Sequence, residues 1–413
     1  MTQLIADRRD IEFVLYEQLH AEDLLDHPRY SAFNRKSFDM ILAETRRLAL
    51  KELLPTCAEG DKEGVRFEDG QVATPASYRH ALEVIREAEL LSLTEDPKWG
   101  GQGLPFLVNQ AVGEYIAGAN YALTMYSHSG HGTGKMIELY GSDMLKALFL
   151  EKLYTSEWGG TMVLTEPEAG SDLGALTTTA VKDEDGTYRI TGSKIFITAG
   201  EHDLHPNIVH PVLARVEGAP AGTKGISIFV VPKFWVNPDG SLGEVNDVVC
   251  TGVEEKMGIH SSATCSMSFG SKGSCRGWLL GEENQGLKIM FHMMNEARLN
   301  IGMQGQVTAS VAYQYALDYA RQRIQGKPLA AMGDPASPSV PIIQHPDVRR
   351  MLLWMKAHVE GMRSLVYYVA ACLEGAEHGE DEARRKRSKG LVDLLTPVVK
   401  AYCAQRGFEV CIQ

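Results

Sequence analysis

One stretch of the chain decides the fold that we expect: Met162-Val163-Leu164-Thr165-Glu166-Pro167-Glu168-Ala169-Gly170-Ser171-Asp172-Leu173. An apolar run ends at Thr165, and Pro, Gly, Ser and Asp follow it at once, which predicts a strand that enters a polar turn. Such a turn gathers backbone N–H groups and hydroxyls, and it suits the polar edge of a flat ring or a phosphate. Taken alone, the segment is equally open to interpretation as a capped structural turn.

A second predicted strand, Ile190-Thr191-Gly192-Ser193-Lys194-Ile195-Phe196-Ile197-Thr198-Ala199-Gly200, also ends in Thr followed by Gly. Phe196 and Thr198 share one face of this strand because side chains alternate with a period of two. An aromatic ring beside a hydroxyl can cover and hydrogen-bond a flavin ring. Both residues could also be ordinary core and edge positions.

The periodicity on either side of these strands predicts an α+β protein with three domains. Residues 1–157 and 281–413 show helical spacing of apolar residues, and residues 158–280 show short strands separated by Gly, Asp and Pro turns. We expect an N-terminal helical domain, a central β-barrel or sandwich, and a C-terminal helical bundle. The expected strands are 161–165, 177–181, 188–190, 194–198, 209–216 and 225–231. The chain runs helix-like to Gln413 without a C-cap signal, so we expect the bundle to be incomplete.

Composition excludes several classes of function. The 413 residues include 41 basic and 53 acidic side chains and carry a formal net charge of −12, so a non-specific nucleic-acid or anionic-membrane binder is not expected. The basic run at 384–389 follows three acidic residues, which is typical of a solvated helix face. No apolar stretch approaches 18 residues, the N-terminus lacks a signal-peptide core, and the seven cysteines form no CxxC pair. We expect a soluble, reduced, cytoplasmic protein without a membrane span.

Two further patterns resemble ligand sites. Gly130–Lys135 resembles a phosphate loop, but three residues separate Gly130 from Gly134 where a P-loop has four, and Met136 follows the lysine. We interpret it as a tight turn between helices. His202, His205 and His210 lack the further ligands of a metal site, so we expect loop and surface histidines and no bound metal.

Together, the two strand segments resemble signatures of the acyl-CoA dehydrogenase family: T-E-P-x-A-G-S-D at 165–172 and G-x-K-x-[WF]-I-T at 192–198. Three more segments match the family in the correct order: Glu255–Gly258, Gly281–Gly286 leading into a helix at 291–298, and Tyr319–Leu329. The resemblance covers about residue 80 to the end. The long N-terminal part, and Arg-Ile-Gln-Gly where the family has Arg-x-x-Phe-Gly, resemble its subgroup of longer chains.

The resemblance implies FAD as the cofactor and acyl-CoA as the substrate. Thr165 and Thr198 would bond the flavin edge, Met162 and Leu164 would offer backbone groups, Ser171 would sit at the signature turn, and Phe196 would stack beside the ring. Arg323 matches, with a loop shorter by one residue, an Arg that holds the adenine and pyrophosphate half of FAD in a neighbouring subunit. Asn295 and Arg298 match the residues that seat the CoA part of the substrate.

The implied reaction forms a trans-2-enoyl-CoA by α-proton abstraction and β-hydride transfer to flavin N5. The family's usual base, a Glu in a Tyr-Glu-Gly-Thr segment, is expected beyond Gln413, so no catalytic residue is assigned within the chain. In a minority of members the base precedes the helix Arg, and that position here is Ala297. Glu296 is adjacent, but one residue turns a helical side chain by about 100°.

The resemblance further implies an electron-transfer flavoprotein or a similar acceptor, a homodimer or homotetramer, and a short or sulfur-containing acyl chain. An acyl-CoA oxidase with the same fold is an alternative function. A non-catalytic acyl-CoA- or flavin-binding assembly subunit is an alternative from a different class.

Overall fold

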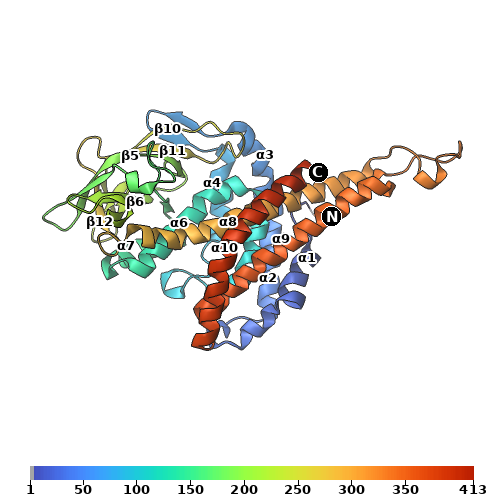
Figure 1. The fold of residues 1–413 in the computed structure, drawn as a ribbon, viewed down its shortest axis with the longest axis horizontal. Helices are drawn as coiled ribbons and strands as arrows, with labels where there is room; N and C mark the ends of the chain where they lie inside the picture. The colour runs from blue at the N-terminus through green and yellow to red at the C-terminus, as the bar shows by residue number, and fades with distance from the viewer. Residues whose placement is uncertain (1–3) are drawn as a thin grey trace. The chain divides into compact units, whose positions relative to one another are not determined.

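The computed structural model describes residues 4–413 and confirms an α+β fold, with helices before and after a central β region (Figure 1). The helices are α1 (Arg8–Glu12), α2 (Arg35–Leu48), α3 (Leu54–Glu63), α4 (Ala76–Glu87), α5 (Phe106–Ala119), α6 (Tyr121–Tyr140), α7 (Asp143–Tyr154), α8 (Gly286–Gln322), α9 (Pro346–His378) and α10 (Glu382–Ile412). The strands are β1 (Arg66–Glu68), β2 (Gln71–Ala73), β3 (Gly159–Gly160), β4 (Thr179–Lys182), β5 (Tyr188–Thr198), β6 (Ile208–Val216), β7 (Ile226–Pro232), β8 (Phe234–Val236), β9 (Leu242–Val245), β10 (Val248–Val253), β11 (Thr264–Phe269) and β12 (Arg276–Leu279).

The chain divides into two compact units that are each discontinuous in sequence. The helical unit contains residues 1–50, 104–119 and 298–413, and the β-containing unit contains residues 51–103 and 120–297. Helix α8 contributes its first residues to the β-containing unit and the rest to the helical unit. The three consecutive domains predicted from sequence remain a proposal about the chain's organisation.

The β-containing unit is built around an eight-stranded sheet in which β5 pairs with three other strands, β4, β11 and β12. The strand order is β10-β11-β5-β12-β7-β6-β3, and β4 pairs with both β5 and β6. The C-terminal part of β5 pairs antiparallel with β11, and its first two residues pair with β12. The predicted strands 188–190 and 194–198 are therefore one continuous strand, since Thr191 and Gly192 keep the extended conformation and the ladder hydrogen bonds.

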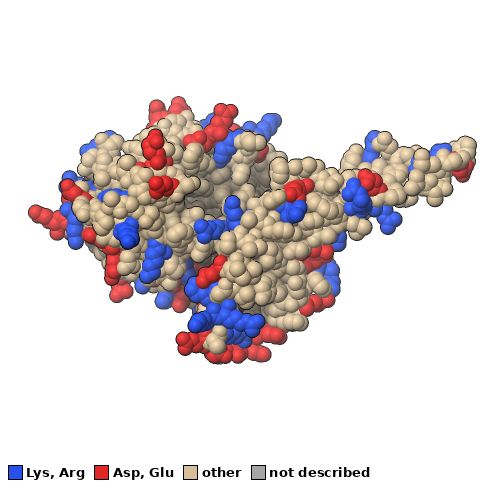
Figure 2. All heavy atoms as spheres, in the orientation of Figure 1, with Lys and Arg blue, Asp and Glu red and all other residues tan. Residues whose placement is uncertain are grey.

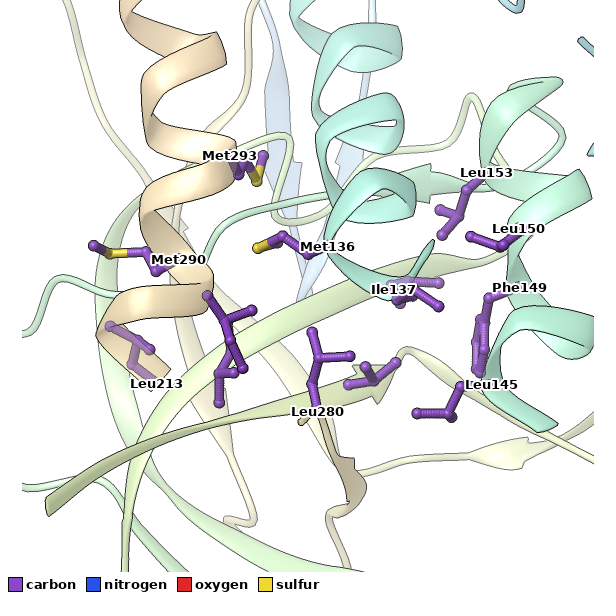
Figure 3. Packing of buried hydrophobic residues seen from close by; sticks show 14 of the residues in the cluster. Met136, Ile137, Leu145, Phe149, Leu150, Leu153, Leu213, Leu280, Met290 and Met293 are labelled. Atoms are coloured by element: carbon purple, nitrogen blue, oxygen red, sulfur yellow. The ribbon is translucent and has the colours of Figure 1, made fainter. Parts of the chain in front are cut away.

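The core of this unit lies between the sheet and three helices, as Figure 3 shows. Met136 and Ile137 of α6, Phe149 of α7, and Met290 and Met293 of α8 all turn toward the sheet and are at least nine-tenths buried. Leu213 and Leu280 face them from the β side. Apolar burial contributes on the order of 25 cal/mol per Å², so this cluster holds the helices against the strands.

The Gly130–Lys135 segment lies inside helix α6, and the prediction of a turn there was wrong. Its glycines permit close packing: an ideal Cβ on Gly132 would lie 2.8 Å from Met293 Cγ, and one on Gly134 would lie 2.7 Å from the Tyr154 ring. Glycine costs about 1 kcal/mol in a helix interior, and the close approach of neighbouring elements offsets that cost here.

The expectation of surface histidines was also wrong, although His202 and His205 do lie in the loop between β5 and β6, whereas His210 lies in β6. His202, His205 and His210 are 1%, 6% and 0% exposed, respectively. Thr161 Oγ1 lies 2.9 Å from His210 Nδ1, and Ser156 Oγ lies 3.0 Å from His205 Nε2. Burial lowers the pKa of His205 to about 4 and that of His210 to about 3, so both rings are neutral near pH 7.

The helical unit is held by a buried ion pair between helices α5 and α9. Arg363 Nη2 and Nε donate to Glu114 Oε1 at 2.7 and 3.0 Å, and neither side chain is more than 1% exposed. Tyr367 and Gln306 also donate to this carboxylate. Helices α8 and α10 approach closely where Gly305 meets Gly407, since a Cβ on Gly407 would lie 2.4 Å from the Gly305 carbonyl oxygen.

The surface carries both acidic and basic side chains, as the composition predicts. Acidic and basic residues are interspersed on the face in Figure 2. Within residues 4–413, every helix is either too short or too polar to traverse a bilayer.

Candidate functional site

The first signature segment lies between strands β6 and β5. Val163 forms a parallel bridge with Val212, and its N–H donates to the Pro211 carbonyl at 2.9 Å. Two residues later, the Thr165 carbonyl accepts from the Ile195 N–H of β5, also at 2.9 Å. The segment that was predicted to end at Thr165 therefore brings that residue beside the second signature strand.

The side chains of Met162 and Leu164 are half-buried on either side of the fully buried Val163, and that of Thr165 is half-buried as well. Met162 and Leu164 pack against the core cluster of the β-containing unit. Their position leaves part of each side chain at the surface of this unit, where a planar ligand could contact it.

Glu166 has a structural role that the sequence interpretation missed. Its carboxylate lies 3.0 Å from Lys194 Nζ, and the two side chains are 3% and 0% exposed. It also accepts hydrogen bonds from the backbone N–H and the hydroxyl of both Thr177 and Thr178, at 2.5–3.0 Å. Burial raises its pKa, but the Thr178 and Thr177 hydrogen bonds and the Lys194 charge outweigh this and hold the pKa at about 2.

Lys194 connects the two signatures directly. Besides Glu166, its Nζ donates to the Leu164 carbonyl at 3.1 Å. The signal that could have revealed this pair is its charge: Lys194 stands inside a predicted strand and Glu166 directly follows one, and buried charges are paired.

The polar turn after Glu166 is exposed. Gly170, Ser171 and Asp172 all face solvent, and Asp172 Oδ1 accepts from the Gly174 N–H at 3.0 Å. Asp172 thereby caps the short helix at Leu173–Ala175. Ser171 thus lies at the surface, beside a capped turn that presents its polar groups outward.

Phe196 is held in an unusual conformation on β5. The register between β5 and β11 shifts between Lys194 and Ile197, which leaves Phe196 in a bulge at φ +59°. A left-handed conformation costs a residue with a Cβ about 1–2 kcal/mol. Phe196 is also 57% exposed, whereas Ile197 is 1% exposed and Thr198 is half-buried. Phe196 and Thr198 thus both remain partly accessible to solvent, on either side of the buried Ile197.

Strained, non-glycine backbone concentrates at ligand-binding positions. Phe196 combines such a backbone conformation with a largely exposed ring, which makes it a candidate for contact with a ligand. The ring and the Thr198 hydroxyl offer a flat apolar surface beside a hydrogen-bonding group, which fits an isoalloxazine ring.

The candidate CoA residues lie on helix α8. Asn295 and Arg298 are three residues apart and therefore neighbours on one helix face. Arg323 directly follows α8, and its Nη2 lies 3.4 Å from Gln325 Oε1. It is exposed, and its carbonyl accepts from the Ile342 N–H at 2.8 Å. The structure brings the Thr165 segment and strand β5 together through the Ile195–Thr165 hydrogen bond. Arg323 belongs to the helical unit and lies on the segment between α8 and α9.

Glu296 contacts His131 of helix α6. His131 Nδ1 lies 2.8 Å from Glu296 Oε1, and its Nε2 hydrogen-bonds Glu95. Burial lowers the pKa of His131, but the two carboxylates outweigh this and raise it well above its usual value. The pKa of Glu296 is lowered in turn, because His131 outweighs the effect of burial. A carboxylate held by an imidazolium is a poor proton acceptor.

Comparison with known proteins gives a consistent result over most of the chain. Residues 36–157, 161–271 and 284–413 match the N-terminal, middle and C-terminal domain models of acyl-CoA dehydrogenases. The chain is 42% identical over 410 residues to 3-methylmercaptopropionyl-CoA dehydrogenase of Ruegeria pomeroyi, covering 97% of this chain and 67% of that protein. It is 39% identical over 420 residues to the broad-specificity linear acyl-CoA dehydrogenase FadE5 of Mycobacterium tuberculosis, covering 99% and 67%.

Solved structures of acyl-CoA dehydrogenases have a similar fold. An acyl-CoA dehydrogenase from Bacillus anthracis in complex with FAD superposes with a TM-score of 0.69 at 23% identity, over 92% of this chain and 60% of that one. The chain spans about two thirds of the length of its sequence relatives. The signatures, the fold and the three matched domains establish that the chain belongs to the acyl-CoA dehydrogenase family.

Proposed function

We propose that this chain acts as an FAD-dependent acyl-CoA dehydrogenase that converts an acyl-CoA thioester to its trans-2-enoyl form. The observation that carries the proposal is Phe196, an exposed aromatic residue held at positive φ beside the open face of β5. Residue types and placement support a flavin site there, since Thr198 lies two residues along β5 and the Thr165 carbonyl accepts a hydrogen bond from the neighbouring Ile195 N–H.

In this proposal, Thr165 and Thr198 donate to the polar edge of the flavin, Met162 and Leu164 contribute backbone groups, and Phe196 covers the ring. The exposed turn at Ser171 offers further donors. FAD, when bound, supplies the acceptor for the hydride that leaves the β carbon. The buried Glu166–Lys194 pair keeps the two signature strands in register, so it positions these groups without contacting the ligand.

The residues that we propose to bind the CoA part of the substrate lie on helix α8. Arg298 would pair with anionic groups of CoA, and Asn295 lies on the same helix face to assist it. The α proton needs a base of suitable pKa. Glu296 is a poor candidate because His131 holds its carboxylate. We therefore assign no base among residues 4–413.

We further propose that the acyl chain of the substrate is short or contains sulfur, and that the electrons pass to an electron-transfer flavoprotein or a similar acceptor. We also propose a homodimer or homotetramer in which Arg323 reaches the FAD of a neighbouring subunit. The proposed location is the cytoplasm. One relative acts on 3-methylmercaptopropionyl-CoA by name, which supports the substrate class. One structural neighbour is an electron-transferring flavoprotein of Acidaminococcus fermentans at 23% identity, which supports the fold alone.

The visible spectrum of the purified protein tests the proposal. We expect a bound flavin and an anaerobic shift of its band on addition of butyryl-CoA. Phe196→Gly and Thr198→Val should each weaken FAD retention, whereas Phe67→Leu, at an exposed aromatic on β1, should not. A colourless protein that fails to bind added FAD would refute the proposal. If the acyl-CoA reduces the flavin and oxygen then rapidly reoxidises it, the alternative function of an acyl-CoA oxidase would be favoured.

A further inference from the structure

Lys256 is a half-buried lysine in the loop between strands β10 and β11. Its Nζ donates to the Thr264 hydroxyl at 2.9 Å and to the Ser262 carbonyl. Both acceptors are uncharged, and no carboxylate among residues 4–413 forms an ion pair with this ammonium group. A charge that is partly removed from water without a charged partner costs free energy, so its position calls for an explanation.

The segment that holds the ammonium group is fixed by two helices of the same compact unit. Tyr126 of α6 donates to the Ser261 carbonyl at 2.7 Å, and its hydroxyl accepts from the Ala263 N–H at 2.9 Å. The Tyr78 hydroxyl of α4 hydrogen-bonds Ser261 Oγ at 2.6 Å. These four residues are buried. The acceptors of Lys256 therefore have a defined place, and they set the place of its charge.

Thr264, which binds Lys256, lies directly opposite Thr198, the residue that we assign to the flavin edge. Strands β11 and β5 are neighbours in the sheet (Figure 1), and Thr264 pairs with Thr198 in antiparallel register. Opposite residues of such a pair present their side chains on one face, with Cβ atoms about 4.5–5.5 Å apart. The next pair, Cys265 and Ile197, is buried on the other face.

The Lys256 charge thus lies on the face that Thr198 presents. Adding the hydrogen bond to the separation of the two threonines places Nζ within about 10 Å of the Thr198 Cβ. Both threonines are half-buried, so a ligand at Thr198 would share this partly desolvated surface with the ammonium group.

Resting on the proposed function, we propose that Lys256 is a positioning residue whose charge raises the reduction potential of the bound flavin. The hydride that leaves the β carbon brings two electrons and one proton to N5, while the α proton goes to the base. A neutral ring system therefore becomes an anion. A fixed cation nearby stabilises the anion and leaves the neutral ring almost unaffected, and it acts here across Thr264 and Thr198 without touching the ligand.

Other charges near the loop do not enter the comparison. Burial lowers the pKa of Lys256, and Glu254 on the same loop acts in the opposite direction. The two oxygen acceptors of the ammonium group favour its protonated form. Asp61 lies 3.1 Å from His260 in this loop. Glu254, Asp61 and His260 are the same in the wild type and in variants of Lys256, so a difference in potential between these proteins reports the lysine charge.

The expected size follows from Coulomb's law. One unit charge at about 10 Å and an effective dielectric constant of about 20 changes the equilibrium between oxidised and reduced flavin roughly fifteenfold. A tenfold change in a two-electron couple is about 30 mV, so this corresponds to about 35 mV. Salt weakens the interaction of partly exposed charges, and we therefore expect at least about fivefold, or about 20 mV.

Anaerobic reductive titration of the FAD-loaded chain against a dye of known potential tests this. Lys256→Met removes the charge, and Lys256→Gln removes the charge but keeps a hydrogen-bond donor. Both variants should lower the potential by at least about 20 mV. Lys256→Arg keeps the charge and should stay within about twofold of the wild-type equilibrium, or about 10 mV. Lys224→Met is the matched control, because it removes a positive charge from an exposed position of the same unit.

The outcomes separate this inference from the proposed function. A protein that holds FAD but keeps its potential in both neutral variants overturns the role of Lys256 and leaves the proposed function standing. The role is also overturned if Lys256→Arg lowers the potential as much as Lys256→Met, or if both neutral variants lose FAD, because contacts rather than charge would then matter. A wild type that binds no FAD overturns the proposed function, and this inference with it. Melting temperatures verify folding, and Lys256→Gln keeps the test decisive if Lys256→Met does not fold.

Discussion

Replacing Lys194 by Met should destabilise the β-containing unit strongly. Met keeps the length and most of the volume of the side chain, but it removes the only charge that compensates Glu166 among the contacts described for that carboxylate. Both side chains are almost fully buried. Removing one partner of a buried ion pair typically costs about 3–5 kcal/mol, because the remaining charge stays desolvated.

The four hydrogen bonds from Thr177 and Thr178 remain in this variant and limit the damage. We therefore expect a loss near the lower end of the range, about 3 kcal/mol. For a unit of this size, about 2–4 °C of melting temperature correspond to each kcal/mol, so the transition should fall by roughly 10 °C. Loss of the Lys194 hydrogen bond to the Leu164 carbonyl should also loosen the first signature segment and weaken FAD retention.

The assay is calorimetry of the wild type, Lys194→Met, Glu166→Gln and the double variant, each with and without FAD. Lys224→Met, at an exposed position, serves as the control and should change stability by less than about 0.5 kcal/mol. The double variant should be more stable than the sum of the single losses implies, because no uncompensated charge remains. A loss below about 1 kcal/mol in Lys194→Met, or strictly additive single losses, would refute the reasoning.

Three other perturbations have predictable outcomes. Phe196→Gly should relieve the positive-φ strain and raise the free energy of unfolding of the apoprotein by up to about 1 kcal/mol, while FAD affinity measured by fluorescence falls. His205 and His210 have folded-state pKa values of about 4 and 3 against about 6.5 when unfolded, so the unfolded chain binds more protons below pH 6.5. Stability in urea should fall as the pH drops through that window, by about 2 kcal/mol per histidine at pH 5. Glu114→Gln should leave Arg363 with a weakened partner and lower the melting transition of the helical unit by an amount equivalent to about 3 kcal/mol.

A specific result would contradict each of these predictions. An apoprotein that loses stability in Phe196→Gly would show that the ring packs on the protein. A flat stability profile between pH 7 and 5 would contradict the neutral buried histidines. For the helical unit, Lys389→Gln is the control, because its pair with Asp393 is exposed and worth at most about 0.5 kcal/mol.

The sequence predicted the fold class and the extended course of the two signature segments because their signals are local. Alternation places Ile197 inside and Thr198 outside, and Pro, Gly and Asp mark the turn after Glu166. The bulge at Phe196 was not predicted, because it depends on how β5 registers with β11, nearly 70 residues later. Periodicity within one strand carries no information about that register.

The charged contacts were also beyond local reasoning. Glu95, His131 and Glu296 come from three distant parts of the sequence, and only tertiary packing brings them together. The glycines near His131 were interpreted as a turn because glycine is a poor helix former, whereas close helix packing selects glycine for its small size.

The core in Figure 3 has a consequence for dissecting the protein. Residues 158–280 look like a domain that could be cloned alone, yet Phe149 precedes them, Met290 follows them, and both fill the same apolar layer over Leu213. An excised segment would present that layer to water and associate with other exposed apolar surfaces. During synthesis, the same layer stays open until the ribosome has released α8, so this part of the chain completes its folding late.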